Sequence, residues 1–177
     1  MNIKDHYKKS NNLTKISLML FFVSLLSSCG IYSFKDVSID YSKIKTIKIG
    51  FIENKARYVN PQLSPRVTDK LQQKIVSQTK LVRTNNDDAH LQISGYISDY
   101  SVSTTAISST QATGNRLTVS VHLIVKNTVE NKNDEFDVSR NFDFSANLSL
   151  QQAEVQLQDE IVRNITDEIF NRLFSNW

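Results

Sequence analysis

The feature that most constrains the fold is a run of nine residues, 117–125, in which every second side chain is apolar and those at 118, 120 and 122 are polar. Such alternation predicts a β-strand with one buried face, because successive strand side chains point to opposite sides of a sheet. A polar turn follows, and the same alternation returns over residues 136–144, so the two segments predict a β-hairpin. The apolar face of the first strand carries Leu117, Val119, Val121, Leu123 and Val125.

Two residues of this hairpin do not fit a simple division into core and surface. His122 lies on the polar face of the first strand, without a second histidine near it in the sequence. Arg140 falls on the apolar face of the second strand, between Val138 and Phe142. We expect Arg140 to reach past an edge of the sheet or to pair with an acid, because an unpaired buried charge is costly.

Residues 44–52 predict another strand, with Ile47, Ile49 and Phe51 on one face and Lys45 and Lys48 on the other. We expect these two lysines to lie on a solvated face of the strand. Residues 80–84 predict a short strand or a sheet edge.

Residues 91–107 predict a long strand with a disturbed alternation, in which Gly95 or the pair Ser98–Asp99 marks a bulge or bend. Its pattern places Ile93 and Ile97 on one face, and Tyr96, Tyr100 and Val102 on the other. Residues 101–113 are rich in serine, threonine and alanine. They predict a strand end followed by a polar loop, which Gly114–Asn115 closes.

Two amphipathic helices complete the pattern. The first is predicted over residues 63–79, with Ser64 as the N-cap, Pro65 at the first helical position and a narrow apolar stripe at spacing four. The second is predicted from Ser149 to about residue 174, because Ser149 and Gln152 have the spacing of a capping box. Its apolar stripe is predicted to contain Val155, Val162, Ile165, Ile169 and Leu173.

The order of these elements predicts an α+β fold in a single domain. About four strands form one mainly antiparallel sheet, and two helices pack on one of its faces to bury both apolar stripes. The other face of the sheet is then polar and open to water or to a partner.

The N-terminal segment predicts export. Four lysines and one aspartate precede an apolar run of about 11 residues, which is too short for a spanning helix of roughly 20 residues. The run ends in residues 26–29 (LSSC), which resemble a bacterial lipobox with cleavage between Ser28 and Cys29. The alternative is an ordinary signal peptide in which Cys29 is a chance small residue near the cut.

This interpretation divides the chain into a lipoprotein signal peptide at 1–28, a lipidated N-terminus and tether at 29–42, and the α+β domain at 43–177. The resemblance to a lipobox implies an S-diacylglycerol and an N-acyl chain on Cys29. Several acyl chains give stable anchoring where one alone is marginal. Cleavage leaves 149 of the 177 residues, which is enough for one domain with a sizeable core.

Composition argues against nucleic acid as a partner. The net charge of +3 resides in the predicted signal peptide, so the remaining chain has 17 basic and 17 acidic residues. A basic surface for nucleic acid is therefore not a bulk property of the exported domain.

The sequence also predicts a protein that is not an enzyme and holds no metal or separate cofactor. The three histidines, His6, His90 and His122, do not form a metal-binding spacing with acidic residues. There is no glycine-rich phosphate loop and no nucleophile motif, and the one cysteine is assigned to the lipid. Asp87 and Asp88 are adjacent carboxylates in an asparagine-rich turn, where acids are usually just solvated.

Short motifs spread over nearly the whole mature chain resemble the LptE family of lipopolysaccharide-assembly lipoproteins. Each motif is weak alone, but their order and spacing together are fairly specific. They are residues 29–34 (CGIYSF), 59–64 (VNPQLS), 77–81 (SQTKL), 115–119 (NRLTV), 167–171 (DEIFN) and the final Asn176–Trp177.

The resemblance implies a fold of two helices on a four-stranded sheet and a role without catalysis. Proteins of this family sit at the periplasmic leaflet of the outer membrane, held by their lipid. They plug and help to assemble a large β-barrel translocon, LptD, and they bind the lipopolysaccharide that it delivers to the cell surface. Gly30 fits outer-membrane sorting, since an aspartate after the cysteine is the usual inner-membrane retention signal.

Contact with lipopolysaccharide requires cations for its phosphates or acidic sugars. No family motif assigns such residues here, so the candidates are chosen by charge and strand position alone. They are Lys45, Lys48, Arg116, Lys126 and Arg140.

Two other functions stay open from the sequence. One is a periplasmic lipoprotein that activates a cell-wall synthase or acts as a pilotin for a secretin, because small α+β domains on lipid anchors serve those roles too. The other is a hydrolase whose site leaves no motif.

Overall fold

The structure is a computed structural model that describes residues 39–108 and 111–174. The predicted signal peptide, its cleavage position at Ser28 and Cys29, and the tether up to residue 38 lie outside the described residues. The described residues belong to one compact unit, Asp36–Trp177.

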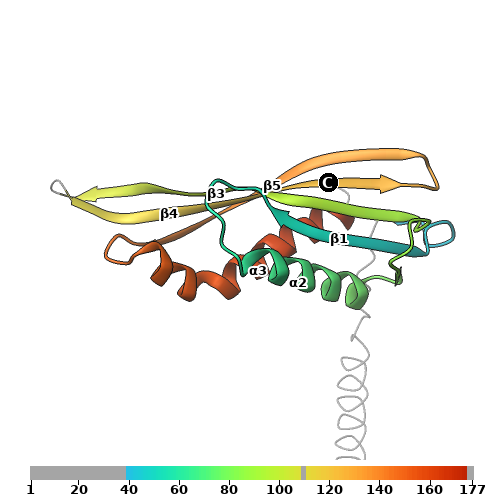
Figure 1. Cartoon of the computed structure of the whole chain (residues 1–177), viewed down its shortest axis with the longest axis horizontal. Coiled ribbons are helices and arrows are strands. Elements are labelled where there is room, and N and C mark those ends of the chain that lie inside the picture. The colour runs from blue at the N-terminus through green and yellow to red at the C-terminus, as the bar shows by residue number, and fades with distance from the viewer. Residues whose placement is uncertain (1–38, 109–110, 175–177) are drawn as a thin grey trace, which may run out of the picture. The chain divides into compact units, whose positions relative to one another are not determined.

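The described residues of this unit form five strands and two helices (Figure 1). In chain order they are β1 (Thr46–Asn54), α2 (Leu63–Gln78), β2 (Val82–Arg83), β3 (Leu91–Ser108), β4 (Gln111–Asn127), β5 (Lys132–Ser145) and α3 (Leu150–Phe174).

The five strands form one sheet in the order β2-β1-β3-β4-β5. Strands β3, β4 and β5 form an antiparallel meander, whereas β1 lies parallel to both β2 and β3. The predicted α+β class, single domain and long antiparallel hairpins are confirmed. The predicted edge at 80–84 is the fifth strand, β2, and the crossover through α2 makes the sheet mixed.

Both helices cover the same face of the sheet (Figure 1). They lie side by side and run in the same direction. Gln62, just before α2, contacts Gln158, and Lys74 near the end of α2 forms an ion pair with Asp167 at 2.7 Å.

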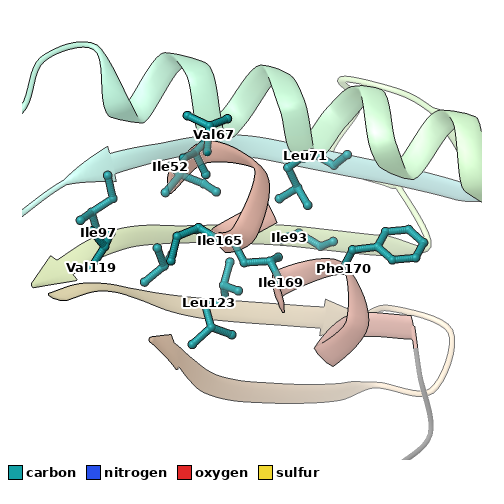
Figure 2. Close-up of a cluster of buried hydrophobic side chains, with 14 of the residues drawn as sticks. Ile52, Val67, Leu71, Ile93, Ile97, Val119, Leu123, Ile165, Ile169 and Phe170 are labelled. Atoms are coloured by element: carbon teal, nitrogen blue, oxygen red, sulfur yellow. The ribbon is translucent and has the colours of Figure 1, made fainter. Parts of the chain in front are cut away.

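The core lies between this helical layer and the sheet. Figure 2 shows Val67 and Leu71 of α2, and Ile165 and Ile169 of α3, pointing toward strand residues. Burying an aliphatic side chain of this size stabilises a fold by about 1.5–3 kcal/mol relative to leaving it exposed. The fully buried side chains include Ile47, Ile52, Leu63, Leu71, Ile75, Ile97, Leu117, Leu123, Ile161, Ile165, Ile169 and Phe174.

The two predicted helix starts have different outcomes. The capping box of α3 is confirmed: the backbone N–H of Ser149 donates to Gln152 Oε1 at 2.9 Å, and the N–H of Gln152 donates to Ser149 Oγ at 3.3 Å. The predicted N-cap of α2 at Ser64 is wrong, because the helix begins at Leu63 with Gln62 as its cap. The backbone N–H of Gln62 has no partner within the helix, and it donates to Asn60 Oδ1 instead.

The predicted apolar stripe of α3 is wrong at one position. Val155 is 80% exposed, whereas Val162, Ile165 and Ile169 are buried. Ala153 in the same part of the helix is fully buried, so the start of α3 does contact the core, but Val155 lies on the exposed side of the helix.

Two bulges change which side chains face the core. A register shift between Ile49 and Ile52 in β1 leaves Phe51 57% exposed and buries Ile52, so the predicted inward orientation of Phe51 is wrong. A second shift, between Ile97 and Asp99 in β3, confirms the predicted irregularity at Ser98–Asp99.

The β3 bulge has a second effect. It carries Tyr100 to the same face as Ile97, where Tyr100 is 3% exposed and joins the core. The predicted placement of Tyr100 with Tyr96 on one face is therefore wrong, because the extra residue shifts the alternation by one.

The predicted polar loop at 101–113 is wrong as well. Strand β3 continues to Ser108, and β4 starts at Gln111, so the segment is the far end of a long hairpin (Figure 1). Gly114 and Asn115, predicted to close a loop, lie inside β4 and pair with Ser145 and Phe144 of β5. Serine and threonine are compatible with a paired strand that has little to bury, and composition alone does not separate this case from a loop.

Candidate functional site

The face of the sheet opposite the helices carries a ladder of polar side chains that link β4 to β5. Thr118 donates to Asn141 at 2.9 Å, and the hydroxyls of Ser120 and Ser139 lie 2.9 Å apart. Each pair lies directly opposite in the strand register. The polar open face expected from the alternation is therefore present, and its groups bond mostly to one another.

Arg116 forms the end of this ladder. Its Nε and one terminal nitrogen donate to the two carboxylate oxygens of Asp143, at 2.7 and 2.9 Å. This hydrogen bond, followed by the charge attraction, lowers the pKa of Asp143. Arg116 is thus already occupied by a bidentate carboxylate, and a new anion would have to compete with that partner.

His122, which stands alone in the sequence, is surrounded in the structure. Its Nδ1 lies 3.0 Å from Asp137, and its Nε2 lies 3.6 Å from Glu135. Its ring packs on Tyr96 at 5.1 Å, and the ammonium of Lys55 lies 4.6 Å from the centre of the Tyr96 ring. The acids belong to the next strand, so only the hairpin register reveals them.

His90 has a structural role. Its Nδ1 accepts the backbone N–H of Lys45 at 3.0 Å, and its own backbone N–H donates to Thr46 Oγ1 at 3.0 Å. These bonds fasten the start of β3 to the start of β1.

A shallow hollow lies on the open face near the turn between β4 and β5. Lys48 of β1 and Lys126 of β4 both line it, together with Gln92, Ser94, Asn133 and Glu135. Lys48 binds Asp87, and that hydrogen bond lowers the pKa of the Asp87 carboxyl. Lys126 is exposed, and among the described residues no carboxylate oxygen lies within 4.0 Å of its ammonium.

The structure therefore brings together two of the five predicted cations, Lys48 and Lys126. Arg140 lies on the helix-facing side of β5 and pairs with Glu168 of α3, as one of the two expectations for this residue had it. Lys45 lies before β1, outside the strand and the hollow, so the predicted shared face of Lys45 and Lys48 is wrong.

A polar cluster that the sequence did not reveal lies at the start of α3. Glu154 accepts hydrogen bonds from Tyr100 at 2.9 Å, Asn60 at 3.1 Å and Tyr58 at 3.3 Å. The rings of Tyr58 and Tyr100 stack at 5.5 Å. The cluster joins the loop before α2 to α3, and it depends on the β3 bulge that turns Tyr100 inward.

We expect stability to fall at alkaline pH through this cluster. Burial raises the pKa of the Tyr100 hydroxyl far above its usual value of about 10, and the neighbouring Glu154 carboxylate adds to this effect. Because the pKa is higher in the folded state, the unfolded chain loses this proton first. The contribution is fully present below pH 10 and is lost as the pH rises above it.

The test is urea unfolding at pH 8 and at several values above 10. Tyr100→Phe removes a hydrogen bond worth about 1 kcal/mol at pH 8 and flattens the alkaline decline. Tyr58→Phe is the matched control, because Tyr58 is 37% exposed and should contribute a smaller part of the slope. An equally steep decline in Tyr100→Phe would contradict the assignment.

The described residues contain neither a cluster of metal-binding side chains nor a membrane-spanning helix. Across residues 39–108 and 111–174, no three His, Cys, Asp or Glu side chains are grouped as a metal site would require. None of the helices in the described part of the chain has the length and apolarity needed to cross a membrane.

Comparison with known proteins gives one family match. The model of the LptE family, described as lipopolysaccharide-assembly, matches residues 44–173. No curated protein sequence matches the chain.

Solved structures with a similar fold have little sequence in common with this chain. Rare lipoprotein B from Shewanella oneidensis is 13% identical, with a TM-score of 0.50 over 71% of this chain and 92% of that chain. The hypothetical protein CT253 from Chlamydia trachomatis is 9% identical, with a TM-score of 0.48 over 73% of this chain and 98% of that chain.

Proposed function

The chain belongs to the LptE lipopolysaccharide-assembly family, and from this membership we propose that it is a lipoprotein that supports LptD, the outer-membrane barrel that delivers lipopolysaccharide. The family match over residues 44–173 is the observation that carries the proposal, because it spans every described strand, all of α2 and all but the last residue of α3. The protein has no catalytic role in this proposal.

In this proposal the domain helps to assemble the barrel and then occupies its lumen as a plug. Lipid on Cys29 holds it at the periplasmic leaflet of the outer membrane. The structure is compatible with a plug in one respect: the open face of the sheet is polar, as a surface against a wet lumen wall should be. Its side chains are largely satisfied by neighbours, so contact with the wall would not leave them unpaired.

The proposal is tested by affinity capture of the lipidated protein from detergent-solubilised outer membrane, with partners identified by mass spectrometry. We expect a large β-barrel in stoichiometric amount that withstands stringent washing. Capture of a cell-wall synthase or a secretin would favour the activator or pilotin function instead. Capture of no partner would also count against the barrel assignment.

We further propose that the hollow lined by Lys48 and Lys126 contacts the phosphates or acidic sugars of lipopolysaccharide. Lys126 is the better donor of the two, because Lys48 already binds Asp87. Glu135 also lines the hollow, and it favours a ligand that presents hydroxyl groups beside its anionic group.

Reversing the charge of Lys126 is expected to weaken binding of purified lipopolysaccharide. A hydrogen bond to a charged group is worth about 1.5–3 kcal/mol, so Lys126→Glu should raise the dissociation constant at least tenfold. Arg116→Glu should have a smaller effect, because Asp143 occupies Arg116. Lys70→Glu is the matched control, since Lys70 is an exposed lysine of α2 on the covered side of the sheet. Equal binding by Lys126→Glu and Lys70→Glu would remove the hollow from consideration.

A further inference from the structure

The two edges of the sheet differ greatly in length. One edge is β2, which has 2 residues, and the other is β5, which has 14. Strand β5 pairs with β4 on one side, and no other described strand lies on its outer side. A long edge strand presents unpaired backbone donors and acceptors, to which an extended segment of another chain can add.

The side chains of β5 carry a net negative charge. The strand has four acids and two bases. Three of the acids point to the open face of the sheet: Glu135, Asp137 and Asp143. Their side chains remain 62%, 70% and 60% exposed, although His122 and Arg116 of β4 lie against them on the inner side. An added strand would therefore meet a row of carboxylates with room on the outer side.

The helix-facing side of the same edge is apolar. Val138 and Phe142 are buried there, and Phe136 and Phe144 are partly buried. Arg140 interrupts this row, but it is bound to Glu168 of α3. The ion pair links the middle of β5 to α3.

A second copy of this chain suits the edge poorly. If two β5 strands pair antiparallel about Ser139, Glu135 of one lies opposite Asp143 of the other. If they pair about Arg140, Asp137 lies opposite Asp143 and the two arginines meet. Like charges directly opposite each other destabilise a strand pair.

From this pattern we propose that β5 is a docking strip for an extended segment of a partner protein, which adds as a strand and carries lysine or arginine toward the open face. In an antiparallel arrangement its cations are spaced by six and then two residues, opposite Asp143, Asp137 and Glu135. Apolar or β-branched residues on its other face continue the row of Val138 and Phe142. The identity of the partner rests on the proposed function, in which it is a segment of the barrel. The chemistry of the partner segment rests only on the side chains of β5.

The test uses the mature lipidated protein in detergent micelles and an 11-residue peptide with lysines at the stated spacing and valine or threonine between them. The control peptide has the same composition, but its lysines are spaced by five and then three residues, so no register places all three on the open face. Hydrogen exchange measured by mass spectrometry should slow several-fold in fragments covering residues 132–145 with the first peptide and not with the control.

Matched variants test the charge pattern. Glu135→Gln combined with Asp137→Asn should weaken peptide binding several-fold, because each opposite-charge pair across strands adds a modest increment. Glu160→Gln, an exposed acid of α3, should leave binding unchanged. Unchanged exchange over 132–145 with the patterned peptide, or equal slowing with both peptides, would overturn the inference.

A photo-reactive residue separates this inference from the proposed function. It is placed at Ser139 of β5 or at Gln73 of α2 during the capture from outer membrane. We expect Ser139 to cross-link to the captured barrel. A barrel that cross-links to Gln73 but not to Ser139 would leave the proposed function standing and overturn the β5 inference. If the patterned peptide protects residues 132–145 but no barrel is captured, the β5 inference stands and the proposed function is overturned.

Discussion

Replacing Cys29 with alanine is expected to release the protein from the membrane while the domain stays folded. Acyl chains contribute about 0.8 kcal/mol for each CH₂ group that enters the bilayer, so loss of the predicted lipid removes nearly all of the anchoring free energy. Cys29 lies ahead of the family match at 44–173 and of every described element, so the core should be unaffected. Membrane fractionation and circular dichroism together measure both parts of the expectation.

Two controls make this result interpretable. Ser27→Ala changes a small residue in the same segment and should leave attachment intact. A version of Cys29→Ala that carries the leader of a soluble periplasmic protein in place of residues 1–28 excludes retention by an uncut apolar segment. If the variant with the exchanged leader still fractionates with membranes as the wild type does, the lipoprotein interpretation is wrong.

The second large effect is expected in the core. Ile169 of α3 has no exposed surface and points toward the sheet in Figure 2. Ile169→Ala removes buried methyl groups and leaves a cavity, which should lower the free energy of unfolding by about 2–5 kcal/mol. Domains of this size are stable by only about 5–15 kcal/mol, so urea unfolding should show a large shift of the midpoint.

Val155→Ala is the matched control for this measurement, because it lies on the same helix and is also a β-branched residue truncated to alanine. With Val155 80% exposed, we expect a change within about 0.5 kcal/mol. Similar losses in the two variants would mean that Val155 packs against the core, which would contradict its exposed position on α3.

Much of the fold was predictable because it depends on local pattern. The alternation over 117–125 identified β4, since a buried strand face needs an apolar residue at every second position. The Ser149–Gln152 capping box marked the start of α3, because both of its hydrogen bonds are formed within four residues. These signals are short in range and do not depend on the register of the sheet.

The errors arose where one residue changes the phase of a strand or where tertiary contacts override composition. The β3 bulge reverses the inward orientation from Tyr100 onward, and the β1 bulge does the same at Phe51. The β1 bulge contains Gly50 beside Phe51, which was a local signal for it, whereas the extra residue of the β3 bulge is Ser98. The strand pairing of 101–108 is invisible in a sequence rich in serine and threonine, because the segment has few apolar side chains to mark a face.

The candidate site was predictable only as a set of residue types. The sequence identified Lys48, Lys126 and Arg116 as cations on polar strand faces. It did not show that Asp143 occupies Arg116, because that pair depends on the register between β4 and β5. The Glu154 cluster was missed for the same reason: its members come from three segments, and a bulge sets the direction of one of them.

The parallel pairing of β1 with β3 has a consequence for the order in which the domain folds. Two residues separate β3 from β4 and four separate β4 from β5, whereas Ile47 pairs with Leu91, 44 residues later in the chain. Closing so long a loop costs entropy before any contact repays it, so we expect the meander and α3 to form first. Until β1 pairs with β3, the β3 edge is uncovered, so we expect the risk of aggregation to be greatest during that interval of folding.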